Sequence, residues 1–111
     1  RLANERGADL VLGLRPSQEE SFHFYYFGTQ SYASPRGRRL AEILHLEISA
    51  MLEVAPPQPE IKSYPLLRET RMPCVIVESP QDFDHASGLA LRLARAVAGY
   101  FNPPGQDGAP A

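Results

Sequence analysis

Two residues of opposite charge, each placed directly after an apolar run, are the first candidates for chemistry in this sequence. Arg15 follows the run Ala8–Leu14, and Glu78 follows the run Cys74–Val77. In sheets of parallel strands, binding and catalytic groups gather beyond the carboxyl ends of the strands. A charged residue also stands at such a place when a strand simply reaches water, and position alone does not separate the two explanations.

The segments that must position these residues read as strands. Ala8–Leu14 and Cys74–Val77 are almost continuously apolar, which is typical of parallel strands covered on both faces. Ser21–Phe27 is dense in aromatic residues, and its alternation directs Phe22, Phe24 and Tyr26 to one face of a sheet and the intervening residues to the other.

Two helices are expected between and after these strands. Ser34 and Pro35 supply a helix cap and a first helical residue, and the apolar period that follows runs to the prolines of Ala55–Pro59. A last helix, from about Ala86, is expected to bury Leu89, Leu93, Ala94, Val97 and Phe101. This order of elements predicts an α/β fold with a mostly parallel sheet and helices packed on its faces.

Length and charge narrow the class of protein. The chain has 111 residues, enough for a single core. We expect one domain over residues 1–101 and a disordered tail over residues 102–111. A net charge of −2 argues against a nucleic-acid partner, and no apolar stretch approaches the roughly 18 residues of a membrane span.

The residues that could bind a metal are scattered. His23, His45 and His85 fall in three separate elements and have no motif spacing, so we expect them to be hydrogen-bonded or exposed. Cys74 is the only cysteine and lies inside an apolar run, which predicts a buried structural thiol. A zinc site built from these side chains would require tertiary convergence that the sequence does not indicate.

Several blocks, taken in order, carry a resemblance. Arg1–Arg15 combines a helix end, an Ala-Asp-Leu step and a strand, and Phe24–Tyr26 is an aromatic strand. A helix with Leu40-Ala41 comes next, then Leu66–Glu78 (LLRETRMPCVIVE), then a helix ending on Tyr-Phe. In this order and spacing the chain resembles the C-terminal part of the zinc-dependent N-acetylmuramoyl-L-alanine amidase family, the amidase type 3 domain.

The resemblance implies a site that this chain has lost. The family holds zinc with two histidines and a glutamate and uses a second glutamate as acid/base. Glu78 matches the acid/base position, and Arg15 falls where a histidine ligand is expected. The other ligands and the first strand fall before Arg1, so the N-terminal strand and metal-ligand region are absent from this chain. Arginine offers no lone pair to a metal. We therefore expect no cofactor, a vestigial Glu78 and a pocket formed by Arg15, Glu78 and Arg68.

Three hypotheses follow. The first is an inactive amidase-like domain of bacterial cell-wall metabolism, in which Arg15 and Glu78 form an ion pair and the partner is a peptidoglycan fragment or a regulatory protein. The second is an active zinc amidase that cleaves the muramic acid–L-alanine bond, if the chain is an excerpt. The third is an interaction module using the aromatic strand 22–27, although we expect those aromatic residues to be core.

Two properties depend on sequence upstream of Arg1. The compartment, cytoplasmic or cell envelope, cannot be assigned without it. A sheet edge left exposed by the missing strand would invite pairing with another chain, so a homodimer is left open.

Overall fold

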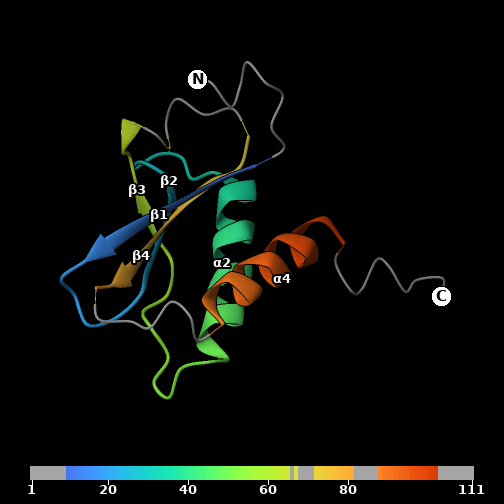
Figure 1. Ribbon diagram of the computed structural model, residues 1–111. Coiled ribbons are helices and arrows are strands. Elements are labelled where there is room, and N and C mark those ends of the chain that lie inside the picture. The colour runs from blue at the N-terminus through green and yellow to red at the C-terminus, as the bar shows by residue number, and fades with distance from the viewer. Residues whose placement is uncertain (1–9, 66, 68–71, 82–87, 103–111) are drawn as a thin grey trace.

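The computed structural model describes residues 10–65, 67, 72–81 and 88–102, which form a sheet packed against two helices (Figure 1). In chain order the elements are β1 (Val11–Ser17), β2 (His23–Phe27), α2 (Pro35–Ser49), β3 (Glu60–Lys62), β4 (Cys74–Pro80) and α4 (Leu89–Phe101). The predicted features of residues 1–9, 66, 68–71, 82–87 and 103–111 lie outside the described residues. Among them are Arg68, His85 and most of the tail.

The sheet has the order β1-β4-β2-β3. β1 runs parallel to β4, β2 runs antiparallel to β4, and β3 runs parallel to β2. The predicted α/β fold with a mostly parallel sheet is therefore confirmed. Both described helices pack on the same face of the sheet (Figure 1).

The main core lies between the sheet and the helices. The predicted alternation of the aromatic strand is confirmed, because Phe22, Phe24 and Tyr26 all join this core while Tyr25 joins a second cluster on the opposite face. The side chains that α2 contributes are fully buried and recur at three- and four-residue steps: Leu40, Ala41, Leu44 and Ile48. Phe22 and Phe24 are each 1% exposed. The aromatic strand is thus a core element, as we expected.

Helix α2 begins as predicted and ends earlier. The Ser34 hydroxyl accepts a hydrogen bond from the Gly37 N–H at 3.0 Å, and Pro35 is the first helical residue. The last helical residue is Ser49, well before the prolines that were expected to stop the helix. The amides of Met51 and Leu52 bond carbonyls only three residues back, so tighter turns replace the last expected helical turn.

The prediction for the last helix was wrong about part of its buried face. Ala94 and Phe101 are exposed, while Ala96 and Tyr100 are buried together with Leu89. The buried residues are seven and four positions apart, so they form one helical stripe that the sequence pattern did not distinguish from its neighbours. Arg39 of α2 fixes this helix end, donating to the Tyr100 carbonyl at 3.1 Å with its guanidinium 4.8 Å from the Tyr100 ring centroid.

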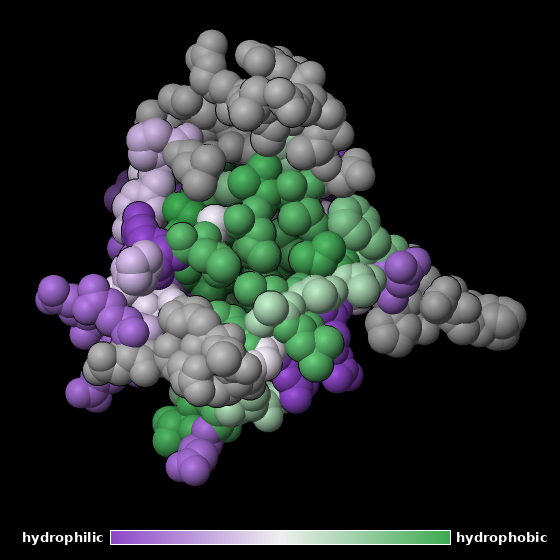
Figure 2. Space-filling model, in the orientation of Figure 1, coloured by the Kyte–Doolittle hydropathy of each residue, from purple (hydrophilic) through white to green (hydrophobic). Residues whose placement is uncertain are grey.

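Strand β1 is more open than its apolar sequence predicts. We expected it to be buried on both faces, but it is an edge strand of the sheet that the described residues form, and Leu14 is 56% exposed. Figure 2 shows apolar residues gathered in the middle of this view of the molecule. Pairing of a second copy along this edge stays a prediction. Within the described part of the chain, no helix combines the length and apolar character that crossing a membrane requires.

Candidate functional site

Arg15 and Glu78 lie inside their strands and not beyond their ends. β1 continues to Ser17 and β4 continues to Pro80, three residues beyond the predicted ends at Leu14 and Val77. Proline can occupy an edge strand because the missing N–H need not face a partner, which allows β1 to pass through Pro16. The longer strands make Arg15 and Glu78 direct neighbours across the parallel β1–β4 pair.

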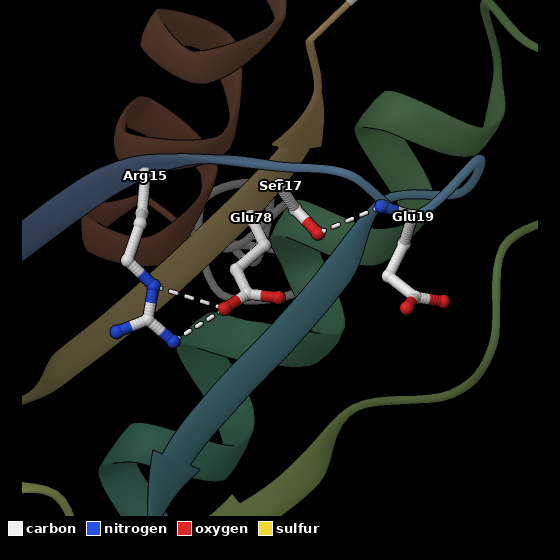
Figure 3. A network of polar contacts seen from close by, with 4 residues as sticks. All are labelled: Arg15, Ser17, Glu19 and Glu78. Carbon is white, nitrogen blue, oxygen red and sulfur yellow. Dashed lines mark hydrogen bonds and ion pairs between the residues drawn. The ribbon is translucent and has the colours of Figure 1, made fainter.

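The expected ion pair between these two residues is present. Arg15 Nε donates to Glu78 Oε2 at 2.9 Å, and Arg15 Nη2 donates to the same oxygen (Figure 3). The Arg15 side chain is 44% exposed and the Glu78 side chain 14% exposed. The hydrogen bond to Glu78, followed by the neighbouring Tyr64 side chain, raises the pKa of Arg15 above its usual value, so the guanidinium stays charged at every physiological pH.

Three aromatic side chains surround the ion pair on the same face of the sheet. His23 of β2 is the register neighbour of Glu78 on its other side, and its ring stacks on Tyr25 with centroids 6.1 Å apart. Tyr64 brings its ring centroid within 5.0 Å of the Arg15 guanidinium carbon and packs edge-on against Tyr25 at 6.0 Å. Arg15, Glu78 and His23 therefore form one row across β1, β4 and β2.

Sequence reasoning missed part of this row. The alternation of β2 already placed His23 on one face with Tyr25, but its position beside Glu78 depends on the antiparallel β2–β4 pairing, which local sequence does not specify. Tyr64 lies in an irregular segment, where no periodic signal could mark it. Of the predicted pocket residues, Arg15 and Glu78 are brought together, and Arg68 lies outside the described residues.

A cavity of about 330 Å³ opens beside Arg15. Its walls are Gly13, Leu14, Arg15, Tyr64, Pro65 and Ile76, so it is largely apolar with one cationic group. Gly13 stands between Val11 and Arg15 on the cavity face of β1 and is the register neighbour of Ile76. Gly13 has no side chain to place over Ile76, and both residues line the cavity.

The donor groups that the described residues place at this site do not make up a set of zinc ligands. Over the ranges that the structure describes, no three histidine, cysteine, aspartate or glutamate side chains come together as a metal site would require. His45 was expected to be hydrogen-bonded or exposed; it is 7% exposed, and its Nε2 lies 2.9 Å from the Pro56 carbonyl oxygen. Cys74 is 4% exposed, as predicted for a structural thiol.

Tyr25 gives this face an alkaline titration that can be measured. Burial, and then the negative charge of Glu78, raises the pKa of Tyr25 from 10.0 to about 12. In the unfolded chain the Tyr25 hydroxyl loses its proton near pH 10.0, whereas in the folded chain it keeps the proton up to about pH 12. Deprotonation therefore favours the unfolded chain, and Tyr25 lowers the free energy of unfolding as the pH rises from 10.0 to about 12. The Tyr25→Phe variant should therefore lose less stability than the native chain over that interval. Urea unfolding below and within the interval measures this, and identical losses in the two proteins would refute the assignment.

The fold and the site together define an α/β domain with a paired arginine and glutamate on the sheet face opposite its helices. Among solved structures, the N-acetylmuramoyl-L-alanine amidase from Clostridium difficile 630 aligns with 94% of this chain at a TM-score of 0.75 and 18% identity. AmiC2 of Nostoc punctiforme, also an N-acetylmuramoyl-L-alanine amidase, aligns with 90% at a TM-score of 0.68 and 17% identity. Ami1 from Mycobacterium abscessus, an N-acetylmuramyl-L-alanine amidase, aligns with 90% of this chain at a TM-score of 0.69 and 15% identity.

These alignments establish the fold of the chain as amidase-like. The chain covers 63%, 62% and 58% of the three amidases, so it spans about three fifths of their length. No family model matches the sequence, and no curated protein sequence matches it.

Proposed function

We propose that this chain is a peptidoglycan amidase-like domain that does not hydrolyse its ligand and serves a binding or regulatory role in bacterial cell-wall metabolism. The amidase-like fold supports the connection to peptidoglycan. The resemblance of Leu66–Glu78 to the amidase block makes Glu78 the vestigial acid/base position and Arg15 the replaced ligand position.

The observation that carries the proposal is the bond between these two positions. A glutamate that acts as a general base must be able to reach the proton of a water or substrate group. Glu78 Oε2 instead accepts from Arg15 at 2.9 Å, and a permanently charged guanidinium stands where a neutral donor ligand would be needed. If Arg15 takes the ligand position that the resemblance assigns to it, its positive charge opposes a divalent cation there.

An active zinc amidase is the second candidate, and the retention of Glu78 favours it. It requires metal ligands from sequence outside this chain and a displacement of Arg15 away from Glu78. We rank it lower, because among the described residues no three histidine, cysteine, aspartate or glutamate side chains come together at this face, and Arg15 adds a positive charge there.

Binding and cleavage can be separated on purified peptidoglycan. The longest native protein that contains this chain should sediment with purified sacculi and leave the number of free amino groups unchanged. Arg15→Gln should reduce sedimentation. Arg38→Gln is the matched control, because Arg38 also pairs with a glutamate, Glu42 at 2.9 Å, but on the exposed side of α2. If the protein sedimented equally with sacculi and with an unrelated insoluble polysaccharide, the binding role would be refuted.

A further inference from the structure

The cavity beside Arg15 has the features of a ligand site. Its volume of about 330 Å³ lies at the lower end of the range of about 300–1,000 Å³ for small-molecule pockets. Apolar groups from β1, β4 and the Tyr64–Pro65 segment form most of its described wall, and Arg15 is the one charged residue among the described residues that line it. Such a pocket accommodates a short apolar body and offers one cationic anchor.

Arg15 keeps donors available for that anchoring. A guanidinium carries five N–H donors, and Glu78 accepts from Nε and Nη2 through a single oxygen. Tyr64 contributes a further side-chain hydrogen bond to this guanidinium, which leaves two of its five N–H donors for a ligand. Two N–H donors of one guanidinium are what a carboxylate needs in order to accept bidentately.

The surroundings hold the guanidinium in place before a ligand arrives. Glu78 fixes one edge of the group, and the Tyr64 ring lies 5.0 Å from its central carbon. Tyr64 is in turn packed edge-on against Tyr25, which is 9% exposed. A charged side chain held in this way loses less conformational entropy on binding than a mobile surface arginine does.

We propose that the cavity binds a small organic carboxylate with a short apolar body, the carboxylate on Arg15 and the apolar body over Gly13 and Ile76 against Tyr64. This rests on the proposed binding role of the site and adds the chemical class of the ligand. It does not depend on a cell-wall origin for that ligand. The same chemistry occurs in a free N-acylamino acid and at the carboxyl terminus of a peptide.

NMR titration of the native chain with N-acetylleucine and with N-acetylleucinamide tests the charge requirement. The acid should give saturable shifts of the Gly13 and Tyr64 amides, and the amide, which has the same apolar body, should bind at least about tenfold more weakly. The peptide acetyl-Ala-Ala-Ala-Leu with a free carboxylate distinguishes the two sources: tighter binding than N-acetylleucine indicates a peptide terminus, and weaker binding a free acid. Equal binding of the acid and its amide would overturn the proposal.

Two variants test the position of the ligand. Arg15→Gln removes the anchor, and Gly13→Val fills the cavity while leaving Arg15 in place. Each should abolish saturable shifts for N-acetylleucine, and Arg38→Gln should leave them as in the native chain. Far-UV circular dichroism checks folding, and Gly13→Ala is a smaller filling step should valine prevent it. Native affinity in a folded Gly13→Val chain would overturn the assignment. If the protein did not bind sacculi but still bound N-acetylleucine more tightly than its amide, the cell-wall role would be refuted and the carboxylate site would stand.

Discussion

Replacing Phe24 with alanine should lower the free energy of unfolding by about 3–5 kcal/mol. Phe24 is 1% exposed in the core between the sheet and α2, where it stacks on Phe22 and meets the His45 ring edge-on at 5.5 Å. Truncation would remove apolar burial and leave a cavity that a close-packed neighbourhood cannot fill. Because domains of this kind are stable by only about 5–15 kcal/mol, the loss should be visible as a large shift of the urea midpoint.

An exposed aromatic residue provides the control for Phe24. Tyr32 is 54% exposed, so Tyr32→Ala should cost less than about 1 kcal/mol. If the two variants unfolded at the same urea concentration, the aromatic strand would not be the core element described above. The third hypothesis, a binding face on that strand, would then have to be reconsidered.

His45→Ala should cost about 2–4 kcal/mol, through the loss of both a hydrogen bond and ring packing. The Nε2 atom of His45 lies 2.9 Å from the Pro56 carbonyl oxygen, and this bond ties the chain after α2 back onto the helix. Without the ring, a carbonyl group at a buried position loses its donor. Urea unfolding measures the total cost.

A second variant and a neighbouring control separate the two contributions. His45→Phe keeps an aromatic ring and removes the hydrogen-bond donor, so it should lower the free energy of unfolding by about 1–3 kcal/mol. Leu46 is the next residue of α2 and is 70% exposed, and Leu46→Ala should change stability little. A His45→Phe variant as stable as the native chain would show that the bond to Pro56 contributes nothing.

The fold was predictable where local pattern and burial agree. The alternation in Phe22–Phe27 and the stripe from Leu40 to Ile48 both reported the core correctly, because each segment buries a single face. The pattern failed on part of α4, where Ala94 and Phe101 were expected to be buried but Ala96 and Tyr100 are the buried residues. It also failed on β1, whose apolar run predicts full burial although Leu14 is 56% exposed.

The candidate site was predictable only as far as single positions. Charge after an apolar run singled out Arg15 and Glu78, and the family resemblance supplied the reason to pair them. The row they form with His23, and the packing of Tyr64 on Arg15, depend on strand order and on an irregular segment. Neither leaves a periodic signal in a sequence. The cavity was not predictable for the same reason, because the effect of Gly13 on the space beside it depends on which residues are its neighbours across the sheet.

Zinc content, measured together with peptidoglycan cleavage, tests the central claim that the Arg15–Glu78 pair stands in place of a metal centre. The longest native protein containing this chain would be incubated with zinc, freed of unbound metal and assayed on purified peptidoglycan. The account predicts no stoichiometric zinc and no cleavage that depends on Glu78. One zinc ion per chain, with cleavage of the glycan–peptide amide that disappears in Glu78→Ala, would contradict it.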